Sequence, residues 1–174
     1  MTTEMIARIT ADVMGRPPIT VSIDTDLATA ARIMIEWKIG CLPVIDQNGT
    51  LAGMLTERLL QAQLAGSRPA SSLEFGERTV LELYGGNPRG ISLAEDALRL
   101  LGTRTAGDVM IDNPVEVGPG MPLWQVAEVM LSEQVSHIAV TENGRPVGVI
   151  ARHDLVRALA NERGAPLPNF AGYV

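Results

Sequence analysis

Two stretches of the chain place apolar side chains at the spacing of an amphipathic helix. In each stretch the apolar residues recur at i, i+3, i+4 and i+7, which aligns them on one face of a helix. The positions are Leu27, Ala30, Ala31 and Met34 in the first stretch, and Leu123, Val126, Ala127 and Met130 in the second. Asp24 or Asp26 would cap the first helix, and Pro122 fits the opening turn of the second. We therefore expect two helices, each with one buried face.

Short apolar runs flank both helices and predict strands. One run precedes each helix, at 19–21 and 115–117, and two follow it, at 41–45 and 51–55 and at 137–141 and 146–150. The later strands of each repeat are joined through Asn-Gly, at Asn48-Gly49 and Asn143-Gly144. Asn-Gly favours a tight hairpin turn with two positive-φ residues. The order β-α-β-β thus occurs twice.

The same residue types return at equivalent points of the two patterns, so the chain contains an internal repeat. An Asp-Val-Met run precedes each pattern, at 12–14 and again at 108–110. Further identical pairs are Pro18/Pro114, Val21/Val117, Leu27/Leu123, Ala31/Ala127, Met34/Met130, Val44/Val140, Gly49/Gly144, Gly53/Gly148 and Leu60/Leu155. A closing helix, expected to begin near Thr56 and near Ala151, completes each repeat as β-α-β-β-α.

The repeats predict a division of the chain into four parts. The first repeat with its N-terminal segment spans 1–60, an insert spans 61–104, the second repeat spans 105–163 and an extended tail spans 164–174. Within the insert, Ser92 and Glu95 have the spacing of a capping box and predict a short helix. We expect the insert to pack on the repeats, with a mobile surface excursion as the alternative.

Composition narrows the functional classes. The chain of 174 residues is 46% hydrophobic but only 3% aromatic, so its core is aliphatic. Its net charge of −6 disfavours nucleic acid as a partner. Apolar runs are too short for a membrane helix and the N-terminus lacks a signal-peptide pattern, so we expect a cytoplasmic protein without a membrane partner. One cysteine and two histidines predict no metal site, and no catalytic motif indicates an enzyme.

The repeats resemble a tandem cystathionine β-synthase (CBS) domain pair, or Bateman module. The matching segments are the Asp-Val-Met leads, Leu42-Pro43-Val44-Ile45-Asp46 with Gly53-Met54-Leu55-Thr56, and Ile138-Ala139-Val140 with Gly148-Val149-Ile150-Ala151-Arg152-His153-Asp154-Leu155. The resemblance covers about 10–60 and 105–160. It implies an α+β fold in which two β-α-β-β-α repeats pack around a pseudo-two-fold axis, and it implies a homodimer.

The resemblance also implies regulation and signal transduction rather than catalysis. Many members hold an adenine nucleotide or related adenosyl ligand in clefts between the repeats, so AMP, ADP, ATP or S-adenosylmethionine is the expected regulatory ligand, and no cofactor is required. In the family, a Thr or Ser at the start of the exit helix faces phosphate. The Asp three residues later holds the ribose hydroxyls, because a carboxylate can accept the hydrogen bonds that both hydroxyls donate.

Each exit segment of this chain departs from that pattern at one position. The first repeat has the hydroxyl, Thr56, but Leu59 replaces the acidic residue. The second repeat has Asp154, but Ala151 replaces the hydroxyl. We therefore expect the better cleft at Asp154. Its candidate residues are Asp154, Arg152, His153, His137, Ile150 and Ala151. The resemblance also implies that Ile19, Thr20, Cys41 and Leu42 surround the adenine base. The second, degenerate cleft would contain Thr56, Leu55 and Glu116.

Simpler interpretations stand beside these assignments. Asp154 could cap its own exit helix, and His137 could be a structural histidine. Trp124 could be an exposed anchor for an unknown regulated protein or for a dimer contact. The alternative function is a protein-interaction scaffold that has lost nucleotide binding, with the insert as its partner surface.

Overall fold

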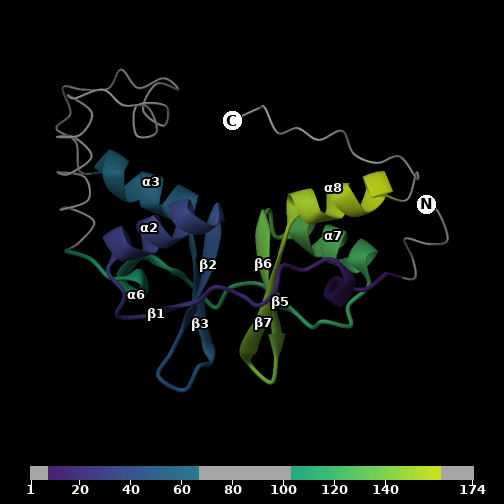
Figure 1. The fold of residues 1–174 in the computed structure, drawn as a ribbon, viewed down its shortest axis with the longest axis horizontal. Coiled ribbons are helices and arrows are strands. Elements are labelled where there is room, and N and C mark those ends of the chain that lie inside the picture. The colour runs from purple at the N-terminus through teal and green to yellow at the C-terminus, as the bar shows by residue number, and fades with distance from the viewer. Residues whose placement is uncertain (1–7, 67–102, 162–174) are drawn as a thin grey trace. The chain divides into compact units, whose positions relative to one another are not determined.

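The computed structural model describes residues 8–66 and 103–161, which form two compact units (Figure 1). The first-repeat unit contains the described parts of 20–48 and 52–112. The second-repeat unit contains the described parts of 1–19 and 113–174, together with 49–51. The predicted capping box at Ser92 and Glu95 and the predicted extended tail lie outside the described residues.

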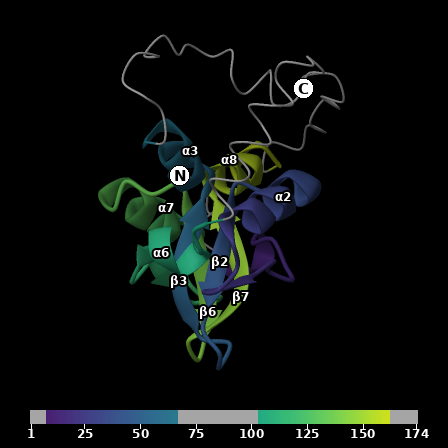
Figure 2. The same cartoon turned by 90° about the vertical axis from the view of Figure 1, so that its left-hand side faces the viewer.

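The first-repeat unit is a four-stranded sheet with helices. Its elements are β1 (Val21–Ser22), α2 (Leu27–Trp37), β2 (Cys41–Ile45), β3 (Leu51–Thr56), α3 (Glu57–Gly66), α6 (Ala106–Val109) and β4 (Ile111–Asp112). The sheet order is β1-β2-β3-β4, with β1 parallel to β2 and β4 antiparallel to β3. The β2–β3 hairpin points away from α2 and α3, which pack together (Figure 2).

The predicted helix of the first repeat forms because one face is apolar and its start is capped. Leu27, Ala30 and Met34 are buried on that face. Of the two candidate caps, Asp26 is the one used. Its carboxylate accepts hydrogen bonds from the Thr29 N–H at 2.8 Å and the Thr29 Oγ1–H at 2.7 Å. These bonds satisfy a helix-end donor that would otherwise lack an intrahelical partner.

The second-repeat unit has a three-stranded sheet with a continuous apolar core. Its elements are η1 (Thr10–Asp12), β5 (Glu116–Val117), α7 (Leu123–Ser132), β6 (His137–Glu142), β7 (Arg145–Ala151) and α8 (Arg152–Asn161). The sheet order is β5-β6-β7, parallel and then antiparallel. The buried core cluster is Met14, Val117, Leu123, Val126, Met130, Ile138, Val140, Ile150 and Ala158.

Both predicted hairpins form, but the tight turn with two positive-φ residues occurs only in the second repeat. In the second repeat Asn143 and Gly144 have φ values of 53° and 76°, as a two-residue turn requires. In the first repeat only Gly49 of the pair has a positive φ, 77°. The reason is local: the Asp46 carboxylate accepts the Asn48 N–H at 2.8 Å, which gives an Asx turn in a longer loop.

Each Asp-Val-Met lead packs in the unit built by the other repeat (Figure 1). In the second-repeat unit, Gly15 and Val149 exchange N–H···O bonds of 2.9 and 3.2 Å, and Met14 is part of the core cluster. In the first-repeat unit, the N–H of Gly107 donates to the carbonyl of Ile23 at 2.9 Å. The sequence shows the duplication of this motif but not this exchange.

The identical residues of the leads have structural roles. Asp12 and Asp108 accept the backbone N–H groups of the residues three positions earlier, at 3.0 and 2.8 Å. Hydrogen bonds from Thr105 lower the pKa of the Asp108 carboxyl, and the backbone N–H has a larger effect than the side chain. Met14 lies against Gly148 and Met110 lies against Gly53, where a side chain on the glycine would collide with the methionine sulfur. The duplicated Met and Gly are therefore packing partners.

Candidate functional site

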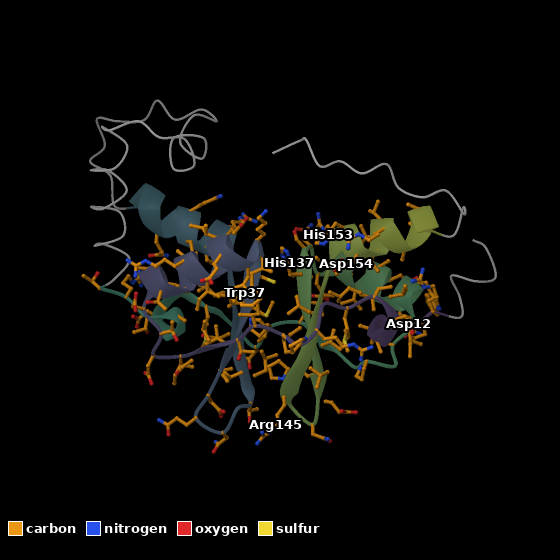
Figure 3. All side chains as sticks on the ribbon, viewed as in Figure 1. Asp12, Trp37, His137, Arg145, His153 and Asp154 are labelled. Atoms are coloured by element: carbon orange, nitrogen blue, oxygen red, sulfur yellow. The ribbon has the colours of Figure 1, made fainter. Side chains whose placement is uncertain are left out.

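Polar side chains gather where β6 begins and α8 begins, in the second-repeat unit. His137 opens β6 and lies opposite Ala151, the last residue of β7, in the antiparallel register. Helix α8 starts at the next residue, Arg152. This register brings His137 beside the first turn of α8, where Figure 3 shows it close to His153 and Asp154. We call Arg152, His153, Asp154 and His137 the α8 cluster.

Both carboxylate oxygens of Asp154 have partners in the unit. Oδ2 accepts the N–H of Ala151 at 2.8 Å, and Oδ1 lies 3.0 Å from Nε2 of His153. The interpretation that Asp154 caps its own helix is thus confirmed. A carboxylate offers about four lone-pair sites, so capping leaves acceptor capacity for a ligand. These two contacts orient the Asp154 side chain, which is 14% exposed and so remains accessible to solvent.

Arg152 is held near the start of β6 by two contacts. Its backbone N–H donates to the carbonyl of Ser136 at 3.1 Å, and its Nε–H donates to the carbonyl of Val135 at 3.1 Å. The residue is exposed. Because Nε–H is only one of the five N–H donors of a guanidinium, this contact positions the side chain and uses one donor of an exposed residue.

His137 is the partly buried histidine of the α8 cluster. Burial lowers the pKa of its imidazole below 6.5, and the neighbouring His153 and Arg152 lower it further, while Asp154 acts in the opposite direction. The neutral form of His137 is therefore favoured near pH 7. His153, by contrast, has a side chain that is 67% exposed.

The other candidates of this unit take structural positions. Ile150 is fully buried and Ala151 is 5% exposed, so both form the apolar floor beneath the cluster. The Glu116 carboxylate, predicted for the degenerate cleft, accepts the Thr141 hydroxyl across β5 and β6 at 2.9 Å. Ile19 is half-buried in the segment before β1.

In the first-repeat unit the corresponding helix start has Leu59 at the position equivalent to Asp154. The Thr56 hydroxyl oxygen accepts the N–H of Leu59 at 3.4 Å, which makes it the cap of α3. Leu59 itself is half-buried, so an apolar side chain occupies the position that holds Asp154 in the second repeat. The remaining candidates are Leu42 and Leu55, which are fully buried, Cys41, which is 5% exposed, and Thr20, which is half-buried.

The expectation that Trp124 is an exposed anchor is wrong. Trp124 is half-buried in the second position of α7 and is not an exposed anchor. Trp37, the last residue of α2, is 61% exposed. Helical spacing does not reveal this exposure, because Trp37 lies three residues after Met34 and so continues the apolar stripe.

Metal-ligating clusters and membrane-spanning helices are both absent from the described residues. Within residues 8–66 and 103–161, no three His, Cys, Asp or Glu side chains come together as a metal ion would require. In the same part of the chain, none of the helices combines the length and the apolar character needed to cross a membrane.

The CBS domain family model matches residues 10–65 and 106–161. The chain belongs to the CBS domain family. A CBS domain structure from a membrane protein of Sphaerobacter thermophilus is 32% identical, with a TM-score of 0.65, and the match covers 88% of this chain and 89% of that one.

Two CBS pairs solved with ligands share the fold at lower identity. The pair of protein MJ0100, in complex with 5′-methylthioadenosine and S-adenosylmethionine, is 22% identical, with a TM-score of 0.65 and coverage of 87% and 99%. CBSX2 of Arabidopsis thaliana, in complex with AMP, is 21% identical, with a TM-score of 0.64 and coverage of 90% and 99%. The predicted tandem CBS fold is thus confirmed.

Proposed function

We propose that this CBS pair is a regulatory module that senses an adenine nucleotide or related adenosyl ligand at the α8 cluster. The observation that carries the proposal is the convergence of a positioned carboxylate, an arginine and two histidines at one helix start. That set can accept hydrogen bonds from sugar hydroxyls and can attract an anionic group. The AMP and S-adenosylmethionine complexes of CBS pairs with the same fold support this ligand class.

Each member of the cluster has a distinct role in the proposal. Asp154, oriented by the N–H of Ala151, accepts the ribose hydroxyls. Arg152 and His153, which are exposed, face the phosphate. The family resemblance assigns the adenine to Ile19, Thr20, Cys41 and Leu42, and the proposal keeps that assignment. Leu59 offers no acceptor, so we propose no ribose contact at α3.

Ligand binding would act by favouring one conformation or oligomeric arrangement of the module. A ligand shifts such an equilibrium only by its differential affinity for the two states. The proposal therefore includes a homodimer and a regulated protein partner that distinguish the bound state from the free one.

Isothermal titration calorimetry tests the proposal with AMP, ADP, ATP and S-adenosylmethionine. We expect one of them to bind wild type and not Asp154→Ala. Asp26→Ala is the matched control, because it also removes a helix-capping carboxylate but lies on α2. Binding lost equally in both variants would assign the effect to stability. No heat with any ligand would overturn the proposal.

A scaffold that has lost nucleotide binding is the second candidate. The observation in its favour is that both oxygens of Asp154 already have protein partners while Ala151 supplies no hydroxyl. It predicts that none of the four ligands changes the melting temperature of the protein, and that Asp154→Ala changes stability alone.

A further inference from the structure

The whole chain contains two histidines, and the α8 cluster contains both. They come from different elements, His137 from the start of β6 and His153 from the first turn of α8. Histidine is the side chain whose ordinary pKa brings a charge change between pH 5 and 8. All of the histidine charge that this protein can gain near neutral pH is thus placed at one point.

The charge of the α8 cluster changes strongly with protonation. The charged groups that face His137 are His153, Asp154 and Arg152. With both histidines neutral, the arginine and the aspartate cancel. With both protonated, the cluster carries two net positive charges, in a chain whose net charge is −6 with neutral histidines. Protonation therefore turns a locally neutral site into a cationic one within an anionic protein.

From this geometry we infer that ligand binding at the α8 cluster is coupled to proton uptake, so that the module responds jointly to pH and to a phosphate-bearing adenosyl ligand. The inference rests on the proposed function and adds its regulation and ligand charge. An anionic phosphate stabilises both imidazolium groups, and by linkage a lower pH strengthens its binding. S-adenosylmethionine carries a sulfonium cation, so the same protonation opposes its binding.

His153 is the more exposed histidine of the α8 cluster. Its side chain is 67% exposed, and its Nε2 lies 3.0 Å from Oδ1 of Asp154. His137 is half-buried, and its neutral form is favoured until a ligand adds negative charge nearby. Occupancy would then be required for full protonation of the cluster.

Calorimetry with AMP tests the coupling between pH 8.0 and 6.5. We expect the Kd of wild type to fall by about tenfold across this range, since uptake of one proton changes Kd by at most about tenfold per pH unit. The double variant His137→Gln with His153→Gln should lose most of this change. Titration of the AMP phosphate, which has a second pKa near 6, is identical for both proteins and cancels in the comparison. Arg157→Gln, which removes a charge from the exposed part of α8, is the charge control and should keep the wild-type slope.

The outcomes separate this inference from the proposed function. AMP binding with equal pH slopes in wild type and the double variant overturns proton coupling and leaves the proposed function standing. S-adenosylmethionine binding that strengthens as the pH falls overturns the charge assignment. Failure of every adenosyl ligand to bind overturns the proposed function itself.

A second measurement needs no ligand. Only two histidine signals exist, so proton NMR titration of the free protein assigns them with one variant each. We expect His153→Gln to raise the pKa of His137, because a neighbouring positive charge is removed, and Asp154→Asn to lower it. An unchanged His137 titration in both variants would show that the groups are not coupled.

Discussion

The contact between Met14 and Gly148 is where the first lead closes the core of the second-repeat unit. A Cβ added at Gly148 would lie 2.5 Å from Sδ and 2.9 Å from Cγ of Met14, and 3.1 Å from the carbonyl oxygen of Gly15. The first two distances are impossible for real atoms, so Met14 has to move. Met14 is only 8% exposed and belongs to the core cluster, so its displacement disturbs buried packing.

Gly148→Ala should therefore destabilise the protein by overpacking. Overpacking costs about 1–3 kcal/mol, and the reduced freedom of the unfolded chain returns about 0.5 kcal/mol. The net loss is about 1.5 kcal/mol, which corresponds to a fall in Tm of about 3–6 °C for a chain of this length. Thermal unfolding followed by circular dichroism measures it. Gly120→Ala is the control: nothing lies within 4 Å of an added Cβ there, so its Tm should hold or rise slightly.

A double-mutant cycle identifies the cause. Met14→Ala alone removes a buried side chain and should cost about 2–5 kcal/mol. In that background the added methyl group of Gly148→Ala has room, so its penalty should disappear, giving a coupling energy of about 1–2 kcal/mol. If Gly148→Ala costs the same in both backgrounds, the methionine contact is not the source and the packing argument is wrong.

Three further predictions concern Gly53 and Asp26 in the first-repeat unit and His137 in the second-repeat unit. Gly53→Ala should still lower the Tm when Met110→Ala is also present, because the Ile111 carbonyl oxygen lies 2.8 Å from the added Cβ and backbone moves less readily than a side chain. Tm values of the two single variants and the double variant check this. Asp26→Ala should cost about 1 kcal/mol at pH 7; since hydrogen bonds lower the pKa of Asp26 below 3.8, the difference from wild type in urea unfolding should shrink as the pH falls below that value. The lowered pKa of His137 means that the unfolded chain binds its proton more readily, so wild type should lose Tm relative to His137→Gln as the pH falls from 7.5 through 6.5, and an unchanged difference would contradict the burial argument.

Local patterns predicted the elements because each element is determined by nearby residues. The i, i+3, i+4, i+7 stripe that begins at Leu27 gives α2, and short apolar runs bounded by turn residues give the strands. The tight turn predicted at Asn48-Gly49 does not form, because the Asp46 carboxylate accepts the Asn48 N–H and gives an Asx turn instead. The exchanged leads could not be predicted, because a short Asp-Val-Met motif carries no local sign of which repeat it packs against.

The candidate site was predicted from a motif, and the same motif could not distinguish a structural role of Asp154 from a ligand contact. Spacing placed Asp154 three residues after Ala151 in the first turn of a helix, which serves a cap and a ligand contact equally well. The structure shows that the cap is formed. It also adds what spacing along the chain does not contain: the β6–β7 register that brings His137 beside α8.

The exchanged lead also links the N-terminal segment to the α8 cluster. Arg8 Nη1 donates to the carbonyl of Ala158 in α8 at 3.3 Å, and Met14 packs in the same core as Ile138 and Ile150. Ile138 follows His137 and Ile150 precedes Ala151, so these buried side chains adjoin the cluster along both strands. Coupling between distant points travels through such contiguous packing when it has two arrangements. A shift of β6 or β7 at the cluster would therefore be felt at Met14, in the lead that precedes the first repeat.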